Sequence, residues 1–301
     1  MLNPASGAGR AGRAWARAAV LLDSAGHRVQ VHTTSGRGDG ARIARSLAGE
    51  GPAAILVVVG GDGSLNEVVN GLLTADARVG LPSVAICPVG SGNDFARSLG
   101  IRAGPKGLTR LLSHPVTQAV DAWQVAWPAG QQWFVNVASF GFTGSAAAII
   151  DRRGKRFRGL SYVYGAMLAL LNHRDRRVVL SSDAEPGAEL LVGAGVLANA
   201  PWFGSAMHVA PGADTGDGRL DLVLVQGAGR LRLLGLLAGV FTGRHLRSPT
   251  VSRRLVGEVA LNWEGELPFE TDGEPVNVTS PATISCRPGA LRFHVPPAPD
   301  R

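Results

Sequence analysis

The chain has 301 residues and 45% of them are hydrophobic, which predicts a soluble globular protein large enough for two domains. Its longest apolar stretches reach only about half of the roughly 20 residues that a bilayer-spanning helix needs, so we expect no transmembrane segment. The first residues show no signal peptide and the two cysteines cannot make a disulfide framework, so we expect a cytoplasmic protein. The net charge of +7 favours anionic partners.

Helix and strand patterns alternate through the first third of the chain. The run at 55–59 is unbroken and β-branched, which is typical of a central parallel strand covered on both faces. The alternation as a whole predicts a doubly wound, mainly parallel sheet with helices on both sides. In chain order, the expected elements are a helix over 11–22, a strand over 29–32, a helix over 39–47, and strands over 55–59 and 84–87.

A glycine-rich turn follows the strand at 55–59 and leads into a helix. Its glycines allow the backbone to approach a ligand, and the start of the helix offers unpaired N–H groups and the positive end of its dipole to a phosphate. The alternative is a purely structural turn, in which Ser64 caps the helix and Glu67 completes a capping box. Capping does not account for Asp62, whose carboxylate beside a phosphate indicates an intervening metal ion or proton donor. We therefore favour a nucleotide site.

A second polar loop, 90–94, follows the strand at 84–87. Taken alone, it indicates a helix N-cap at Asn93 or Asp94. Because ligands of such sheets bind at the carboxyl ends of the strands, we expect Thr34 and the two glycine turns to converge on one nucleotide. In that arrangement the hydroxyl of Ser91 and nearby N–H groups form a second wall of the phosphate site.

From about residue 116 the pattern changes to extended runs separated by turn-rich stretches, which predicts antiparallel β structure. Apolar helices are expected over 160–171 and 231–241. The extended runs are 117–127, 132–139, 177–181, 189–197, 219–225, 256–263, 282–286 and 291–295.

A dense basic run at 152–158 is interrupted by only one aromatic residue, Phe157. No nucleic-acid motif accompanies it, so we favour an anionic membrane surface over RNA or DNA. An ordinary solvated basic loop is the alternative.

Two acidic stretches lie in the second part of the chain. The segment 214–221 holds three carboxylates and reads either as a hairpin turn or as a loop that binds a hard cation such as Mg²⁺. The segment 269–275 contains Asp272-Gly273-Glu274, which fits the tip of a hairpin. A rigid turn of this kind can also present the carboxylate that accepts a hydroxyl proton in phosphoryl transfer.

These motifs resemble the diacylglycerol kinase catalytic family, which includes bacterial diacylglycerol kinases, related lipid kinases and sphingosine kinases. The resemblance implies an α/β nucleotide-binding domain at 1–115, completed by 288–301, and an antiparallel β-sandwich domain for the lipid substrate at 116–287, a fold similar to that of NAD kinase. Four segments carry it across nearly the whole chain: Asn3-Pro4-Ala5-Ser6-Gly7, G-G-D-G-S-L-N-E-V-V-N-G-L at 60–72, P-V-G-S-G-N-D-F-A at 88–96 and Asp272-Gly273-Glu274.

The resemblance also implies roles for individual residues. Asp272 is expected to be the general base, with Glu274 beside it, and Asp62 is expected to act in catalysis through Mg²⁺. The loop at 214–221 is similar to a structural magnesium loop, whose ligands here are Asp214, Asp217 and the carbonyl of Arg219. The residues implied to bind ATP are Thr34, Gly60, Gly61, Asp62, Gly63, Ser64, Leu65, Asn66, Glu67, Ser91 and Asn93.

The expected function is transfer of the γ-phosphate of ATP, with Mg²⁺, to a lipid hydroxyl, most simply that of diacylglycerol. An NAD kinase-like enzyme and a non-catalytic nucleotide- or lipid-binding regulator are the alternatives. The sequence N-E-V-V-N-G after the glycine turn and the late D-G-E argue against the NAD kinase-like enzyme. We expect a protein peripheral to the inner face of an anionic membrane, with no nucleic acid partner; the sequence leaves open whether it forms a homodimer.

Overall fold

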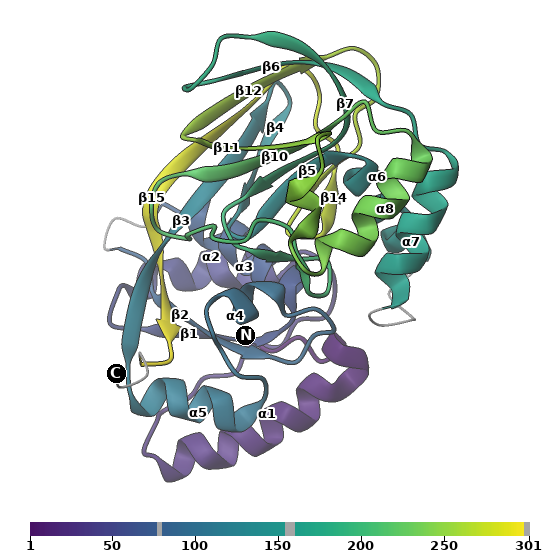
Figure 1. Ribbon diagram of the computed structural model, residues 1–301. Helices are drawn as coiled ribbons and strands as arrows, with labels where there is room; N and C mark the ends of the chain where they lie inside the picture. The colour runs from purple at the N-terminus through teal and green to yellow at the C-terminus, as the bar shows by residue number, and fades with distance from the viewer. Residues whose placement is uncertain (77–79, 154–159, 298–301) are drawn as a thin grey trace. The chain divides into compact units, whose positions relative to one another are not determined.

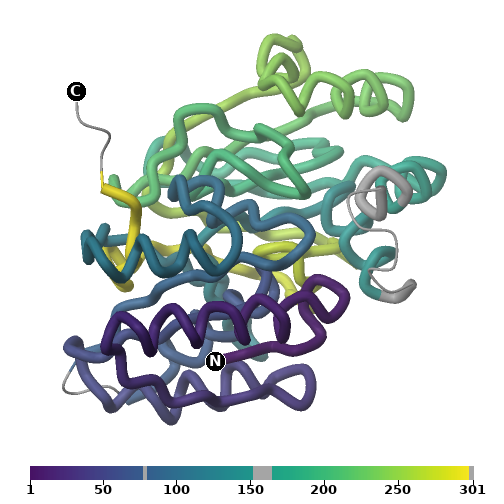
Figure 2. The backbone as a smooth tube through the Cα atoms, turned by 90° about the horizontal axis from the view of Figure 1, so that it is seen from below, coloured from purple at the N-terminus to yellow at the C-terminus, as the bar shows by residue number. Residues whose placement is uncertain are grey.

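The computed structural model describes residues 1–76, 80–153 and 160–297 (Figures 1 and 2). The chain divides into two compact units, of which the first is Met1–Val120 with the segment from Gly289 onward and the second is Asp121–Pro288. Two strands, β3 (Val116–Trp127) and β15 (Ala282–Val295), have residues in both units. The side chains of the basic run at 152–158 lie outside the described part of the chain.

The first unit is built on a parallel sheet. Strand β1 (Ile55–Gly60) pairs in parallel with β2 (Ser83–Pro88), and β2 pairs in parallel with the end of β15, where Phe293 lies opposite Val84. On the other side of β1, Leu2 makes parallel bridges to Val59 and to Thr33. The predicted strand at 29–32 is not formed, because Met1 and Leu2 provide a strand partner only near Thr33.

Helices cover both faces of this sheet. α1 (Ser6–Ser24) and α5 (Pro105–Ser113) lie side by side on one face, and α2 (Asp39–Leu47) and α3 (Asp62–Leu73) lie on the other (Figures 1 and 2). Their apolar faces meet the buried strand residues, as when Ala18 and Leu22 of α1 pack with Val59 and Cys87. The first turn of α1 is kinked, since Gly7, Ala8 and Gly9 have left-handed backbone angles. This doubly wound arrangement confirms the predicted fold class of the first part.

The second unit is an antiparallel β structure folded around one large hydrophobic core. Trp123, Phe134, Phe140 and Phe269 are fully or almost fully buried there. The predicted run at 132–139 is two strands, because the chain changes direction at Val135 and Asn136. The predicted runs at 282–286 and 291–295, in contrast, belong to one strand, β15. The other strands are β4 (Gly130–Phe134), β5 (Val137–Gly141), β6 (Arg176–Ser182), β7 (Ala188–Ala198), β8 (Trp202–Phe203), β9 (Met207–His208), β10 (Leu220–Gln226), β11 (Val251–Val256), β12 (Glu258–Trp263), β13 (Phe269–Thr271) and β14 (Glu274–Val276).

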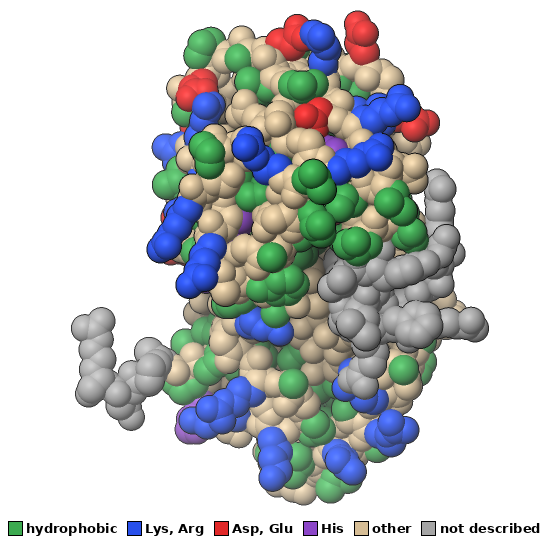
Figure 3. Space-filling view, turned by 45° about the vertical axis from the view of Figure 1, so that its right-hand side comes forward, with side chains coloured by type: hydrophobic (Ala, Val, Ile, Leu, Met, Phe, Trp, Pro, Cys, Tyr) green, Lys and Arg blue, Asp and Glu red, His purple; other side chains and the backbone are tan. Residues whose placement is uncertain are grey.

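Three α-helices accompany these strands: α6 (Phe142–Arg153), α7 (Leu160–Leu171) and α8 (Arg230–Val240). The two predicted helices, at 160–171 and 231–241, correspond to α7 and α8. α7 and α8 contact each other, and hydrophobic side chains gather on the face of the second unit that carries them (Figure 3). Within the described ranges, no helix combines the length and the apolar character that crossing a bilayer requires.

Candidate active site

Three loops of the first unit meet at the carboxyl end of β1. The main-chain N–H of Val89 donates to the carbonyl of Gly60 (2.9 Å), which joins the loop after β2 to the turn after β1. Gly61 and Gly90 pack backbone against backbone, because a Cβ added at Gly90 would lie only 2.6 Å from the Cα of Gly61. The two glycine turns that the sequence predicted to converge are therefore in direct contact, and a side chain at Gly90 would force them apart.

Arg10 ties the third loop to this pair. Its Nε donates to the carbonyl of Gly7 (2.9 Å), and its Nη2 donates to the carbonyls of Val89 (3.1 Å) and Gly90 (3.2 Å). The sequence analysis missed Arg10, because its partners in the second loop are 79 and 80 residues away. One guanidinium thus satisfies three carbonyl oxygens and joins the third loop to the loop after β2.

Asp62 and Ser64 stand at the start of α3. The N-cap of this helix is Gly61, which makes no side-chain cap bond, and the first intrahelical bond runs from Leu65 N to Gly61 O (3.0 Å). Ser64 Oγ accepts from Asn3 Nδ2 (2.8 Å), and Asp62 Oδ1 accepts from the main-chain N–H of Phe95 (3.4 Å). Ser64 therefore does not cap the helix, and both side chains connect the turn to its neighbouring loops.

Three residues of the implied ATP set have structural positions instead. Glu67 accepts the N–H groups of Gly38 (2.8 Å) and Gly40 (2.9 Å) at the start of α2, so the capping box considered for α3 is wrong. The side chain of Leu65 is only 4% exposed and belongs to the core, and Asn66 is equally buried, with its carbonyl bonded to Asn70 Nδ2. A nucleotide could reach Leu65 only through its main chain.

Three other residues of the implied ATP set, Thr34, Ser91 and Asn93, lie in the loops themselves. Thr34 is buried, and its N–H donates to the carbonyl of Leu2, one residue before Asn3. Ser91 is exposed. Asn93 has a left-handed backbone (φ 53°) and donates from Nδ2 to the carbonyl of Gly90 (3.1 Å), while its buried Oδ1 has no partner. An acceptor left unsatisfied beside N–H groups at the start of a helix suits a ligand that carries both phosphates and hydroxyls.

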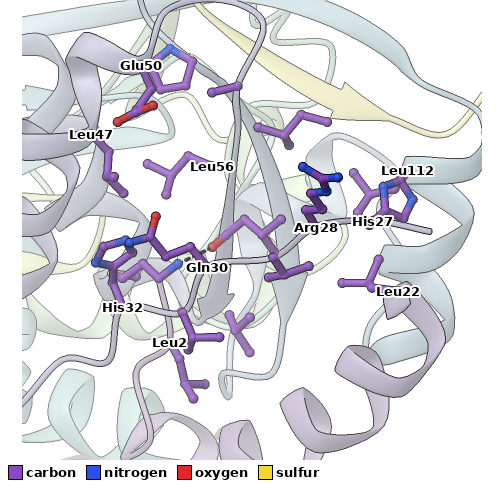
Figure 4. A pocket seen from close by; sticks show the side chains of 18 of the residues that line it. Leu2, Leu22, His27, Arg28, Gln30, His32, Leu47, Glu50, Leu56 and Leu112 are labelled. Atoms are coloured by element: carbon purple, nitrogen blue, oxygen red, sulfur yellow. Dashed lines mark hydrogen bonds between the residues drawn. The ribbon is translucent and has the colours of Figure 1, made fainter. Parts of the chain in front are cut away.

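A groove of about 400 Å³ lies away from these loops, along the amino-terminal part of β1 and residues 28–32 (Figure 4). The labelled lining mixes leucines, such as Leu2, Leu22, Leu56 and Leu112, with polar and charged residues such as His27, Arg28 and Glu50. None of the residues of the implied ATP set lines it, so we assign it no part in the chemistry.

In the second unit, Asp272 sits at the tip of the β13–β14 hairpin. Thr271 pairs with Glu274, and the two residues between them, Asp272 and Gly273, have φ of 51° and 83°. Positive φ at both positions is the two-residue turn that Asp-Gly favours, so the predicted hairpin is confirmed. Glu274 follows as the first residue of β14 and is half-buried.

The carboxylate of Asp272 is held by the main chain between β4 and β5. Its Oδ1 accepts from the N–H groups of Asn136 (2.9 Å) and Val137 (3.1 Å), and its Oδ2 accepts from Val135 (3.3 Å). The side chain is 8% exposed. Three donors from one rigid segment fix the orientation of this carboxylate, which is the property that a proton acceptor in catalysis requires.

Asn199 supports the segment that holds Asp272. Its side chain is fully buried, donates to the carbonyls of Asp121 (3.1 Å) and Val135 (2.6 Å), and accepts from Trp123 Nε1 (3.0 Å). The sequence analysis did not find Asn199, because the bonds join strands that are far apart along the chain. Asn136, in the supported segment, has a buried Oδ1 without a partner.

Glu270 is a fully buried acid below the turn. Its Oε1 lies 2.5 Å from Ser139 Oγ, and its Oε2 accepts from the N–H of Gly273 (2.6 Å). Burial raises the pKa of Glu270 to about 8, and the charges of Asp272 and Glu274 act in the same direction, against the two hydrogen bonds. Glu270 is therefore protonated at neutral pH.

The acidic loop at 214–221 is arranged mainly by its own turns. Asp214 Oδ1 accepts from Gly216 N (3.0 Å), and Asp217 Oδ1 accepts from Arg219 N (2.9 Å). Asp221 is buried and forms an ion pair with Arg253. In the described part of the chain, no group of three or more His, Cys, Asp or Glu side chains is placed to hold a metal ion. The two exposed carboxylates and the carbonyl of Arg219 remain a predicted magnesium site.

Two family profiles match the chain. The diacylglycerol kinase catalytic domain matches residues 1–125, and the YegS C-terminal NAD kinase beta sandwich-like domain matches residues 136–295. The boundary between them falls close to the division between the two units. Together the profiles cover both units.

Several curated proteins are similar over most of the chain. "Probable lipid kinase YegS-like" of Chromohalobacter salexigens is 33% identical over 258 residues, covering 83% of this chain and 79% of that protein. "Diacylglycerol kinase" of Mycobacterium tuberculosis is 29% identical over 300 residues, covering 97% of this chain and 93% of that protein.

Among solved structures, a diacylglycerol kinase from Bacillus anthracis superposes with a TM-score of 0.73 at 19% identity, covering 98% of this chain and 95% of that chain. An NAD kinase from Archaeoglobus fulgidus in complex with ATP gives a TM-score of 0.51 at 12% identity, covering 94% of this chain and 89% of that chain. These likenesses show the fold, an α/β unit followed by a β-sandwich unit. The chain therefore belongs to the diacylglycerol kinase catalytic family and is a lipid kinase.

Proposed function

We propose that this lipid kinase transfers the γ-phosphate of ATP to the free hydroxyl of diacylglycerol, giving phosphatidic acid and ADP. Relatives named diacylglycerol kinase that align with nearly the whole chain support this choice of lipid. The observation that carries the chemistry is the carboxylate of Asp272, fixed by three main-chain donors at the tip of a rigid hairpin.

The first unit supplies the nucleotide site in this proposal. The phosphates of ATP bind to the N–H groups of the turn from Gly60 to Ser64, with Ser91 and Asn93 on the opposite loop and Thr34 beside them. Mg²⁺ bound with the nucleotide and Asp62 would neutralise charge on the transferred phosphoryl group. Leu65 and Glu67 stabilise the helices around this site and do not bind ATP through their side chains.

The second unit supplies the proton acceptor. As the lipid hydroxyl oxygen bonds to the γ-phosphorus, the bond from that phosphorus to the oxygen of ADP breaks and the hydroxyl proton passes to Asp272. Oδ2 is the oxygen suited to this role, because it receives the longer of the three main-chain bonds. The protonated Glu270 below limits the negative charge around Asp272.

A direct test compares lipid and nucleotide acceptors. The purified protein receives labelled ATP and Mg²⁺ with diacylglycerol micelles, with total cell lipid or with NAD. Asp62→Ala and Asp272→Asn are each expected to lower turnover by at least about 100-fold, measured on protein whose unfolding transition shows that it is folded. Glu185→Gln, an exposed change in the second unit, is the matched control and keeps full activity.

The outcomes separate the alternatives. Label on another lipid alcohol but not on diacylglycerol would replace the proposed substrate. Label on NAD would favour the NAD kinase-like enzyme, and ATP binding without transfer to any lipid would favour a regulator. Near wild-type turnover by a folded Asp272→Asn protein would remove Asp272 from the mechanism.

The loop at 214–219 is proposed, on the resemblance, to bind a structural Mg²⁺ through Asp214, Asp217 and the carbonyl of Arg219. The residues fit a magnesium ion, because both carboxylates are exposed. Each uses its Oδ1 to accept one main-chain N–H of its own turn. Mg²⁺ is expected to raise the unfolding temperature of the parent but not that of Asp214→Asn with Asp217→Asn. An equal rise in both proteins would dismiss this loop as the site.

A further inference from the structure

Helix α8 has apolar residues on the side that faces solvent. Leu231, Leu234, Ala238 and Phe241 recur at every third or fourth position, so they form one stripe along the helix and its C-cap. Leu231 is 88% exposed, and Leu234 and Phe241 are 40% and 46% exposed.

The opposite side of α8 already supplies its packing. Leu233 and Val240 are buried there, and Leu236 and Leu237 pack against the core cluster that contains Leu233. The outward stripe is therefore not needed to hold the helix in place.

α7 contributes further exposed apolar surface. Met167 and Leu171, one turn apart on α7, are 44% and 63% exposed. α7 contacts α8, and Figure 3 shows hydrophobic side chains gathered on the face of the second unit that carries the two helices. We call the set Leu231, Leu234, Ala238, Phe241, Met167 and Leu171 the α8 face.

The charged residues next to α8 along the chain are all positive. Arg230 and Arg232 lie at the start of α8, Arg244 and Arg247 follow its end, and all four are exposed. The sequence contains no Asp or Glu from 222 to 257. An exposed apolar stripe with arginines at both ends is the pattern of a helix that lies in the interface of an anionic bilayer.

We propose that the α8 face docks on the surface of an anionic lipid bilayer, with its apolar side chains among the acyl chains and the flanking arginines on the lipid phosphates. The inference deepens the proposed function, because diacylglycerol is uncharged and stays within the membrane. The charge pattern distinguishes this occupant from a second copy of the chain, since two α8 faces would place arginines against arginines.

The test measures sedimentation of the full-length protein with sucrose-loaded vesicles. Wild type is expected to bind vesicles of phosphatidylcholine with phosphatidylglycerol, and to bind pure phosphatidylcholine vesicles more weakly. Leu231→Ser with Phe241→Ser is expected to lower the partition coefficient at least about 10-fold. Val179→Ser with Leu255→Ser removes two other exposed apolar side chains (44% and 53%) from strands β6 and β11, and is expected to bind like wild type.

Activity separates docking from catalysis. The α8-face variant is expected to lose at least about 10-fold of its turnover on diacylglycerol in vesicles, while keeping turnover on a short-chain diacylglycerol dissolved as monomers. Because serine substitutions could disturb packing, Phe241→Trp provides a second readout, and its added emission should shift to the blue on anionic vesicles.

The remaining outcomes count against either the docking surface or the proposed function. Equal vesicle binding by the wild type and the α8-face variant would overturn it, as would a dimer that the variant converts to a monomer. If vesicle binding depends on the α8 face but no lipid is phosphorylated, the proposed function fails and the docking surface stands. If diacylglycerol is phosphorylated but vesicle binding does not depend on the α8 face, the docking surface fails and the proposed function stands.

Discussion

Asp272 and Glu270 lie on one hairpin, but their surroundings favour opposite protonation states. Asp272 receives three main-chain N–H donors, which stabilise an ionised carboxylate. Glu270, two residues earlier, is fully buried and has only Ser139 and one N–H as partners, so the pKa of its carboxyl is raised to about 8. One hairpin thus holds an acceptor and a neutral acid side by side.

This arrangement predicts a pH-dependent stability that Glu270→Gln removes. Between the ordinary glutamate pKa of 4.5 and about 8, folded Glu270 keeps a proton that the unfolded chain releases. Stability therefore falls as the pH rises through this window, by an amount on the order of a few kcal/mol. Gln reproduces the neutral acid, with its amide toward Ser139 and its carbonyl toward Gly273. Urea unfolding across the window should show a flatter profile for Glu270→Gln, and parallel profiles would contradict the assignment.

Among single residues, the sequence predicted those whose role depends on their immediate neighbours in the chain. Asp272-Gly273 was recognisable because the turn needs two positive φ angles in succession, and the glycines at 60–63 because they stand between a buried run and a helix pattern. Arg10, Asn199 and Glu270 were not recognisable, because their roles come from partners brought close only by the fold.

Among the elements, the N-terminal edge of the first sheet is the least regular. Met1 and Leu2 lie between β1 and the segment ending at Thr34, with Met1 N donating to Val57 O (2.8 Å) and Leu2 N donating to His32 O (2.8 Å). The groove of Figure 4 continues their path between the same two neighbours. Its side walls are main-chain edges and its lining is largely aliphatic, which is the environment of a buried strand.

Adding about five alternating valine and threonine residues before Met1 is expected to stabilise the protein, because they can pair with both edges and fill the groove. The increase in the free energy of unfolding should be larger near pH 6 than near pH 8. Burial lowers the pKa of the Met1 amine from 8.0 to about 6, so the unfolded chain binds more protons in this window and stability rises with pH by roughly 2 to 3 kcal/mol. An extension moves that amine out of the fold.

A glycine-serine extension of equal length is the control for this change. It should remove the pH dependence without giving the full stabilisation. Equal unfolding free energies for the two extended proteins would show that the groove does not accept a strand.

The elements also show where periodicity suffices. Helix α7 and most strands of the second unit lie where the patterns predicted them, because their apolar faces are long enough to define a period. The predicted strand at 29–32 was wrong, because a strand requires a neighbour along its length and sequence alone does not show that neighbour.

For the whole molecule, β15 is one of the two strands that have residues in both units. Its beginning pairs with β12 in the second unit, where Ser285 lies opposite Glu258, and its end pairs with β2 in the first. Phe293 is fully buried there, with its ring 5.1 Å from that of Phe95, and His294 is hydrogen-bonded to Ser83. The sequence placed the last strand in the first unit only through the family resemblance, because 282–286 and 291–295 read as separate runs.

Phe293→Ala is accordingly expected to destabilise the protein by about 3–5 kcal/mol, the usual cost of removing a buried ring. Arg292→Ala, an exposed neighbour on the same strand, should change stability by less than about 0.5 kcal/mol. Urea unfolding of both variants, followed with a probe in the first unit, checks the difference. A small effect of Phe293→Ala would mean that the end of β15 is not part of that core.

The shared strand also determines the order in which the protein can be completed on the ribosome. Residues 1–120 emerge early, but the edge of β2 waits for a partner that is translated only after the second unit. Until then the nascent chain presents an open parallel sheet edge, a surface that chaperones recognise and that other chains can join. A premature stop anywhere in the second unit would therefore leave the first unit unfinished as well, and the truncated product should be found in aggregates or be degraded.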